Sequence, residues 1–412
     1  MTDHSADAGR LTTREAADRL GVKPETVYAY VSRGQLASRR DPGGRGSTFD
    51  AAEVETLARR GRRDPSAGGD PTQRIRTGIT LIERDRYWFR GVDAAELARR
   101  YHYEEIADWL WTGTLRPGIR FTAPPGALAA GRRAVAALPA ESGSADRLRA
   151  AAIAAAVTDP VRFDLDRDAV LGSARILIPT LVDALPPAGP GGSGERDPLA
   201  LRLWSRLTAR PADAESLRTL DMALSLLIDH DLAASTLAVR VAASTRAHPY
   251  AAVSAGLGAL DGPLHGAAGG LAHRMLAEAL ERGGAAPVVA DHLRAGRSVP
   301  GLGHRLYRGR DPRAEALFEA LGRIPAAGPA LETALEVESA AARGLDLKAN
   351  VDLALAVLTV ASGMPADASE TIFAVGRTAG WIAHALEEYG EGSLRLRPSG
   401  HYTGPRPPLP LP

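Results

Sequence analysis

Apolar residues recur at helical spacing along most of the chain, and only short stretches break this pattern. The Ala- and Leu-rich segments 222–245 and 249–260 are apolar enough to be buried core helices. Segments 79–81 and 87–89 are instead short enough for a two-stranded β-hairpin. The pattern therefore predicts a large helical domain that opens with this hairpin, and a surface loop over the low-complexity segment 184–198.

The N-terminal part of the chain has a pattern of its own. Thr12 and Glu15 predict a capping box at the start of a first short helix, and Pro24 opens a second helix. A Gly-rich turn among arginines then predicts a hairpin, and Asp50 with Glu53 predicts a second capping box before a third helix. This order resembles the winged helix-turn-helix domains of the MerR or excisionase type.

The resemblance implies that this module binds DNA, with the second helix in a groove and the hairpin on phosphates. The residues concerned are Thr26, Tyr28 and Ala29 on the helix and Arg39, Arg40 and Arg45 in the hairpin. Acidic residues nearly balance the basic ones in this segment, so a small helical interaction or packing module remains the alternative.

The composition sets outer limits on the rest. With 412 residues, the chain can bury a large core and form two or three domains. It has no cysteine, which excludes disulfides, thiolate nucleophiles and cysteine metal sites and fits a reducing cytoplasm. No apolar run reaches membrane-spanning length, so we expect no membrane partner and a cytoplasmic location. The formal net charge of +1 does not require a polyanionic partner.

Three separated stretches place an ionisable group among glycine, proline or asparagine. They are DGPLHG around His265, PGLGHRLYRGRDPR around His304, and ANVD ending at Asp352. Because Gly and Pro restrict the backbone, His265 is expected on a rigid turn at a helix end. Two imidazoles and a carboxylate held in this way indicate carbon acid chemistry, in which a base removes a proton beside a carbonyl while imidazoles stabilise the oxyanion. For one stretch alone, a buried histidine with a backbone partner, or an aspartate near a helix N-terminus, is an equal explanation.

These stretches belong to an ordered set. DHDLAAST from Asp229 is followed by GPLHG, PGLGHRLYRGRDPR, NVD, GRTAGWIAH from Gly376, and RPSGHYTGP from Arg397. In this order of motifs, from about Thr77 to Pro405, the chain resembles the citrate synthase family. The resemblance implies an all-α fold with a large and a small helical domain and a short β-hairpin, preceded by the small winged helix-turn-helix module.

The resemblance also implies domain boundaries. We expect the helix-turn-helix module at 1–62, a charged Gly/Pro-rich linker at 63–74, the large domain at 75–265 and 367–412, and the small domain at 266–366. The small domain would close over the large domain and exclude water during the reaction.

By the same resemblance, the three ionisable groups share one reaction. Asp352 would be the base that deprotonates acetyl-CoA, His265 would support the enol, and His304 would polarise the ketone of oxaloacetate. Water would then cleave the citryl thioester, and no metal or redox cofactor would be required.

Two alternatives remain open. One is a 2-methylcitrate synthase that uses propionyl-CoA, because one methylene changes selectivity by only about 1–3 kcal/mol. The other is a DNA-binding regulator that senses oxaloacetate, citrate or acyl-CoA with little turnover.

The substrate carboxylates need cations with fork geometry, which arginines supply. The family pattern assigns oxaloacetate to His230, Arg313, Arg377 and Arg397, and the coenzyme A phosphates to Arg308. Arg397 would reach the neighbouring subunit's site, which implies a homodimer.

The chain departs from the family pattern at Ala233, Ala349 and Ser399. These departures remove no proton-transfer group, but they leave the acyl-CoA choice and the rate open.

Overall fold

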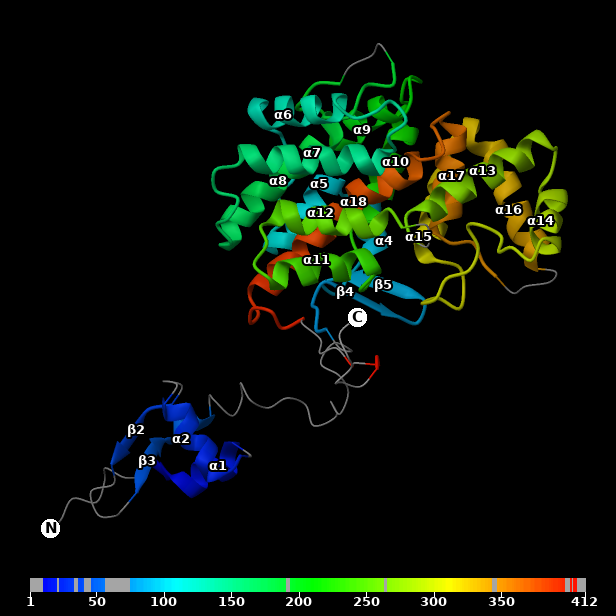
Figure 1. Ribbon diagram of the computed structural model, residues 1–412. Coiled ribbons are helices and arrows are strands. Elements are labelled where there is room, and N and C mark those ends of the chain that lie inside the picture. Colours follow the sequence, from blue (N-terminus) through cyan, green and yellow to red (C-terminus); the bar gives the residue numbers. More distant parts are fainter. Residues whose placement is uncertain are drawn as a thin grey trace. The chain divides into compact units, whose positions relative to one another are not determined.

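The computed structural model describes residues 10–20, 22–32, 36–40, 46–55, 75–189, 193–262, 265–342, 347–396, 401 and 403–405. By its internal contacts the chain divides into two compact units, of which one ends at Ile75 and the other begins at Arg76 (Figure 1). Among the described residues, no helix combines the length and the apolar character needed to cross a lipid bilayer.

The N-terminal unit packs short helices against a small antiparallel sheet. Its elements are β1 (Arg10–Thr12), α1 (Thr13–Leu20), α2 (Pro24–Ser32), β2 (Ser38–Arg40), β3 (Ser47–Asp50) and a helical segment over 51–55. The strand order is β1-β3-β2, so the predicted hairpin is present and gains β1 as a third strand that was not predicted. Ala16, Val27 and Phe49 are fully buried between the helices and the sheet and form the core of the unit.

The two predicted capping boxes of this unit have different outcomes. The first is confirmed, because Thr12 N donates to Glu15 Oε2 at 2.7 Å and Glu15 N donates to Thr12 Oγ1 at 3.3 Å. The second prediction was wrong. Asp50 Oδ1 accepts from Glu53 N at 3.1 Å, but the Glu53 carboxylate accepts from Ala37 N and does not return to Asp50. Glu53 therefore ties the third helix to the residue that precedes β2.

The second unit opens with a three-stranded antiparallel sheet of β4 (Thr80–Glu83), β5 (Arg86–Phe89) and β6 (Val92–Asp93). The predicted hairpin is confirmed, and β6 is an additional strand. Arg84 and Asp85, which connect β4 to β5, have φ of 53° and 60°, the left-handed conformation that matches the twist of a two-residue hairpin.

The rest of this unit is helical. The helices are α4 (Ala94–Arg100), α5 (Tyr103–Thr112), α6 (Pro125–Ala136), α7 (Ser144–Thr158), α8 (Arg167–Asp183), α9 (Leu199–Leu207), α10 (Ala214–Leu226), α11 (Ala234–Ser244), α12 (Pro249–Leu260), α13 (Ala267–Glu281), α14 (Ala285–Arg294), α15 (Pro312–Leu321), a 3-10 turn (Pro325–Ala327), α16 (Gly328–Ala342), α17 (Val351–Ala361) and α18 (Ala368–Tyr389). The segment 184–198, predicted as a surface loop, connects α8 to α9. Ala184 and Leu185 are buried, the described residues 186–189 and 193–198 are exposed or partly buried, and 190–192 lie outside the described residues.

Segment 222–245 is not a single helix, in contrast to the prediction. Helix α10 ends at Leu226, α11 begins at Ala234, and between them Asp231 has φ of 58°. Periodicity did not reveal the break, because the residues on both sides of it are apolar and helix-forming. The break leaves His230 on a non-helical turn.

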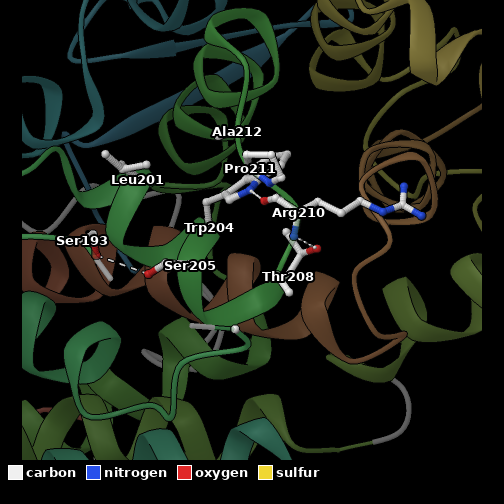
Figure 2. Close-up of a pocket in the computed structure, with 10 residues that line it drawn as sticks. Ser193, Leu201, Trp204, Ser205, Thr208, Arg210, Pro211 and Ala212 are labelled. Atoms are coloured by element: carbon white, nitrogen blue, oxygen red, sulfur yellow. Dashed lines mark hydrogen bonds between the residues drawn. The ribbon is translucent and has the colours of Figure 1, made fainter. Parts of the chain in front are cut away.

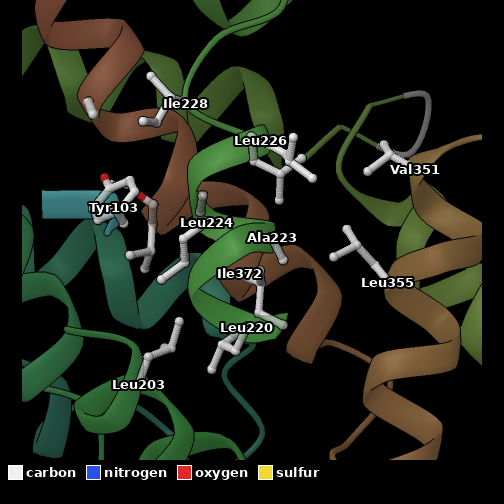
Figure 3. Close-up of a cluster of buried hydrophobic side chains, with 14 of the residues drawn as sticks. Tyr103, Leu203, Leu220, Ala223, Leu224, Leu226, Ile228, Val351, Leu355 and Ile372 are labelled. Atoms are coloured by element: carbon white, nitrogen blue, oxygen red, sulfur yellow. Dashed lines mark hydrogen bonds between the residues drawn. The ribbon is translucent and has the colours of Figure 1, made fainter. Parts of the chain in front are cut away.

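Helix α18 packs against many other helices of the unit and holds this turn close. Trp381 of α18 is fully buried. A Cβ at Gly380 would lie 2.0 Å from the carbonyl oxygen of Ile228, so only glycine allows the turn to approach the helix this closely. Figure 3 shows Leu224 of α10 and Ile372 of α18 in the same cluster of buried side chains. The apolar core therefore positions the segment that carries His230.

Helices α13 to α17 pack against one another in a second group of the same unit (Figure 1). They lie within the predicted small domain, whose boundaries at 266 and 366 stay a prediction.

Candidate active site

A short backbone bridge joins the loop that carries His304 to the start of α17. Leu302 pairs with Ala349 in an isolated antiparallel β-bridge. Gly301 has φ of 80°, and a Cβ there would lie 2.7 Å from Leu353 Cβ, so the crossing requires glycine. The bridge sets the His304 loop beside the helix that carries the predicted base.

Asp352 lies in the first turn of α17. Asn350 caps this helix, because its Oδ1 accepts from Asp352 N at 3.0 Å. Burial raises the pKa of the Asp352 carboxyl to about 6, although the Arg313 cation acts in the opposite direction. The group is thus ionised at neutral pH and still basic enough to accept a proton, which suits a general base.

Asp311 positions the predicted substrate residue Arg313. Both residues are buried, and Asp311 Oδ2 accepts from Arg313 Nη2 at 2.7 Å. The same oxygen accepts from the peptide N–H of Val351 at 3.2 Å. Because of this pair, Arg313 is held at a fixed place, with Nη2 3.5 Å from His304 Nε2.

His304 is held as a neutral donor. Its Nδ1 accepts from the peptide N–H of Leu306 at 3.0 Å, so the proton of the neutral ring sits on Nε2. Burial, together with the Arg313 cation, lowers the pKa of His304 to about 4. His304 Nε2–H and Arg313 Nη2–H are therefore two neighbouring donors, and one carbonyl or carboxylate oxygen placed between them would satisfy both.

His230 packs against this pair. Its ring centroid lies 5.1 Å from that of His304 in an edge-to-face arrangement, and its Nε2 lies 2.6 Å from Tyr307 Oη. Burial, followed by the Arg313 and Arg377 cations, lowers the pKa of His230 well below its ordinary range. The ring is neutral at physiological pH and can offer a hydrogen bond without a charge.

A buried polar network fixes the turn that carries His230. Asp229 Oδ1 lies 3.1 Å from His384 Nε2, and Asp229 Oδ2 accepts from Thr80 Oγ1 at 2.5 Å. Arg240 Nη1 donates to His384 Nδ1 at 2.8 Å, which leaves the proton of the neutral His384 ring on Nε2, facing Asp229. The network connects β4, α11 and α18 to this turn.

Arg377 is a buried cation with a spare donor. The residue is 1% exposed, its Nε donates to Leu227 O at 2.8 Å, and its guanidinium lies 4.5 Å from the centre of the Phe373 ring. Within the part of the chain that the structure describes, Nη1 has no hydrogen-bond partner. Burial lowers the pKa of Arg377 to about 10, so the group is still a cation at neutral pH. An anionic ligand would satisfy both the charge and the spare N–H.

His265 contacts the same aromatic ring, with its centroid 5.8 Å from that of Phe373. Its Nε2 lies 2.8 Å from Ser235 Oγ. The predicted turn at a helix end is confirmed, because His265 N donates to Gly262 O at 2.9 Å just before α13 begins. Burial, followed by the Arg377 cation, lowers the pKa of His265.

The predicted site residues thus fall into connected and separate groups. His230, His304 and Arg313 lie together, and Arg377 and His265 both contact Phe373. Asp352 is joined to the first group through Val351 and Asp311. Arg308 is exposed, and its peptide N–H is held at 2.9 Å by Asp85 Oδ1 of the β4–β5 turn. Arg397 and Ser399 lie outside the described residues.

Three residues of the site escaped the sequence analysis: Ser235, Tyr307 and Asp311. All three lie inside the motifs DHDLAAST and PGLGHRLYRGRDPR. Membership of a motif was the only available signal for Ser235 and Tyr307, because His265 and His230, with which they pair, come from other elements. For Asp311 the partner Arg313 is two residues away, and only its bond to Val351 N depends on the tertiary structure.

The departure at Ala349 has a local partner. Ala349 N donates to Glu338 Oε1 at 3.1 Å, a bond that the proline common at this position in the family could not make.

A surface cavity on the second unit does not coincide with this site. A cavity of about 310 Å³ lies along α9 and the segment leading into α10, lined by residues that include Trp204, Thr208 and Arg210 (Figure 2). None of the predicted catalytic residues lines it. The candidate active site is identified by the hydrogen-bond donors of His304, Arg313 and Arg377, and not by a cavity.

The predicted DNA-contacting residues belong to the N-terminal unit. Tyr28 is 50% exposed on α2, Thr26 on the same helix is partly buried, and Arg39 is exposed on β2. Arg40 also lies in β2, and Arg45 lies outside the described residues.

Comparisons with known proteins agree with this architecture. Residues 70–399 match the family "Citrate synthase, C-terminal domain", and residues 10–62 match the family "Helix-turn-helix domain". The citrate synthase of Haloferax volcanii is 33% identical over 337 residues, which is 76% of this chain and 88% of that protein. Citrate synthase 2 of Bacillus subtilis is 38% identical over 186 residues, 44% of this chain and 50% of that protein. A solved ternary complex of Thermoplasma acidophilum citrate synthase with carboxymethyl coenzyme A and oxaloacetate has a TM-score of 0.67 and 25% identity, covering 85% of this chain and 98% of that one.

Proposed function

Because the chain belongs to the citrate synthase family and is an acyltransferase, we propose that it condenses acetyl-CoA with oxaloacetate and water to give citrate and coenzyme A. One observation carries the proposal. His304 Nε2–H and Arg313 Nη2–H are two donors 3.5 Å apart that one oxygen would satisfy, and Arg377 adds a buried cation with a spare N–H. The ketone and carboxylate oxygens of a keto dicarboxylate could accept hydrogen bonds from His304, Arg313 and Arg377.

The proposed oxaloacetate site uses cations for the carboxylates and neutral rings for the ketone. Arg313 and Arg377 would pair with carboxylates, with Arg397 as a further contact, and His230 would add a hydrogen bond. His304 would donate from Nε2 to the ketone oxygen. A neutral donor is suitable there, because it strengthens its bond as negative charge develops on that oxygen.

The proposed enolisation uses Asp352 and His265. Asp352 takes a proton from the thioester methyl group while His265 donates to the thioester oxygen, so that an enol and not a free enolate forms. The Ser235 hydroxyl lies 2.8 Å from His265 Nε2, and we propose that it donates to this nitrogen, which would leave the ring proton on Nδ1 for the substrate. The methylene carbon then attacks the ketone carbon, and His304 stabilises the oxygen.

Hydrolysis of the citryl thioester completes the proposed reaction and releases coenzyme A. Arg308, exposed beside the His304 loop, would contact the coenzyme A phosphates. Each step uses proton transfers and hydrogen bonds from the chain itself, and we propose no metal or redox cofactor. Propionyl-CoA, which would give 2-methylcitrate, stays the alternative acyl donor, because one methylene changes selectivity by only about 1–3 kcal/mol.

Thiol release from acetyl-CoA and from propionyl-CoA, each with and without oxaloacetate, tests the proposal. We expect oxaloacetate-dependent release that Asp352→Asn lowers about 1,000-fold or more. The ratio of kcat/KM for the two thioesters decides between the acyl donors. Folded protein that releases no thiol from either thioester would contradict the enzymatic proposal and favour the regulator that only senses these metabolites.

A homodimer is part of the proposal. Ile153 and Val157 of α7 are 59% and 71% exposed, and Leu237 and Val241 of α11 are similarly spaced and exposed. Both helices pack on α12, so the two apolar stripes flank one helix. Exposed apolar stripes of this kind are typical of interfaces, and we propose a second copy of the chain as the partner.

Light scattering on Val157→Asp/Val241→Asp protein tests the dimer, with Leu335→Asp as a control that changes an exposed leucine on α16. We expect a halved mass only for the first variant.

Mixed dimers of Arg397→Ala and Asp352→Asn chains test the shared site. Each variant alone should be inactive, and mixing should restore part of the activity. No recovery from mixed dimers would contradict a contribution of Arg397 to the neighbouring site.

We also propose that the N-terminal unit binds DNA. Its match to a helix-turn-helix family, the exposed Tyr28 on α2 and the exposed Arg39 on β2 support this. We expect salt-sensitive binding to genomic DNA fragments that is lost on deletion of residues 1–70 and weakened by Arg39→Ala. Arg19→Ala is the control, because it removes the same charge from an ion pair with Glu55. Equal loss in both variants, or no binding at low salt, would favour a packing module.

A further inference from the structure

We infer that Tyr307 is a positioning residue that sets the tautomer of His230 and supports His304 at the ketone site. The inference rests on the proposed function of that site, in which both histidines serve the oxaloacetate. Tyr307 is 5% exposed and lies three positions after His304 in the same loop.

Tyr307 contacts both histidines at once. Its Oη lies 2.6 Å from His230 Nε2, and its ring centroid lies 4.8 Å from that of His304 with 36° between the planes. One side chain therefore sets the hydrogen bonding of one imidazole and packs against the other.

The length of the first contact favours the Tyr307 hydroxyl as the donor. Hydrogen bonds from ring N–H groups to oxygen are rarely shorter than about 2.7 Å, whereas hydroxyl donors commonly reach about 2.5–2.8 Å. Because the distance is 2.6 Å, we assign the Tyr307 hydroxyl as the donor and His230 Nε2 as the acceptor. With Nε2 as the acceptor, the neutral His230 ring carries its proton on Nδ1, the nitrogen that does not face Tyr307. Tyr307 thereby leaves the His230 Nδ1–H available to donate a hydrogen bond to the substrate.

The loop itself is anchored independently of the tyrosine hydroxyl. Asp85 accepts from Arg308 N at 2.9 Å and from Gly309 N at 3.3 Å, and Leu306 N donates to His304 Nδ1 at 3.0 Å. Removal of the hydroxyl alone should therefore leave the path of the loop unchanged. This makes Tyr307→Phe a specific test, because it keeps the ring on His304 and deletes only the donor.

We expect Tyr307→Phe to raise KM for oxaloacetate about tenfold, as the loss of one buried hydrogen bond predicts. KM for the acyl-CoA should stay within about twofold, because that substrate does not meet His230. Tyr389→Phe is the matched control. Its hydroxyl donates to Ala247 O at 2.6 Å in a partly buried setting, and neither residue belongs to the proposed site, so the change should affect stability and not KM.

A double-mutant cycle separates positioning from general packing. In a His230→Asn background, Tyr307→Phe should have no further effect on oxaloacetate affinity, because the acceptor is already gone. An additive effect, or a rise in both KM values together with the loss of stability seen in the control, would overturn the inference.

Calorimetric binding of oxaloacetate to wild type and Tyr307→Phe keeps the inference separate from the proposed reaction. If the wild type releases no thiol, the proposed enzymatic function fails, and the binding measurement still tests Tyr307. Unchanged oxaloacetate affinity in Tyr307→Phe would overturn the inference in either case.

Discussion

The carboxylate of Asp311 accepts a hydrogen bond of 3.2 Å from the peptide N–H of Val351. Val351 directly precedes Asp352, and Asp311 also holds Arg313 at 2.7 Å. A single buried carboxylate therefore connects helix α15, which carries a proposed substrate cation, to helix α17, which carries the proposed base. The spacing between these two groups depends on this connection.

Asp311→Asn should therefore destabilise the protein and weaken oxaloacetate binding together. Breaking a buried ion pair leaves a charge without a partner, and we expect a loss of about 3–5 kcal/mol in the free energy of unfolding. Chemical denaturation measures the loss. Asp291→Asn, which alters an exposed ion pair with Arg282, is the control and should leave stability nearly unchanged. Equal effects in the two variants would contradict the role of Asp311.

The rate should fall at acid pH because of Asp352. Burial raises the pKa of this carboxyl to about 6, so the fraction of ionised base decreases as the pH falls through 6. The pKa of His304, lowered to about 4 by burial, keeps that ring neutral in the same range. We expect kcat/KM to fall about tenfold per pH unit below 6. Circular dichroism at each pH excludes unfolding as the cause, and a rate that stays constant down to pH 4.5 would contradict Asp352 as the base.

Asp352→Asn should lose activity without losing stability. A carboxyl whose pKa is raised on folding is destabilising at pH values above that pKa, because the folded protein disfavours its charge. A neutral amide removes this penalty, so the melting temperature should stay the same or rise. A clear drop in melting temperature would indicate a structural role for the carboxylate.

Arg377→Met should abolish the stabilisation of the protein by oxaloacetate. In the wild type, ligand at about 100 times its Kd should stabilise the fold by about 2.7 kcal/mol, which thermal melting detects. Arg202→Met is the control, because Arg202 is equally buried and pairs with Asp183 at 2.8 Å. The control should melt earlier but keep the shift with oxaloacetate. A shift that persists in Arg377→Met would contradict the anion-binding role.

Ser235→Ala should lower kcat about 10–100-fold and leave KM for oxaloacetate within about twofold. The serine hydroxyl lies 2.8 Å from His265 Nε2, and without it the ring proton is free to occupy either nitrogen. Steady-state kinetics separates the two parameters. Ser369→Ala is the control, since Ser369 Oγ is buried without a hydrogen-bond partner among the described residues. A change in oxaloacetate KM alone would place Ser235 at the other substrate.

The local sequence was a reliable guide where the signal was local. The Thr12–Glu15 capping box, the turn before α13 and the β4–β5 hairpin depend on residues a few positions apart, and each is confirmed. The second capping box is absent because the Glu53 carboxylate accepts a hydrogen bond from the peptide N–H of Ala37, 16 residues away. The break at 227–233 was missed because apolar, helix-forming residues lie on both sides of it, and the close approach of Ile228 to Gly380 is visible only in the tertiary structure.

The chain alone thus determined its helical class, its two-part organisation and the motifs that carry His265, His304 and Asp352, because glycine, proline and capping residues act over a few positions. Only the tertiary structure decided which nitrogen of each imidazole faces a partner, and why Asp352 titrates near pH 6. Those properties arise from burial and from contacts with residues such as Tyr307 and Ser235. A proton's position and a pKa are set by neighbours in space, and the order of residues along a chain does not specify those neighbours.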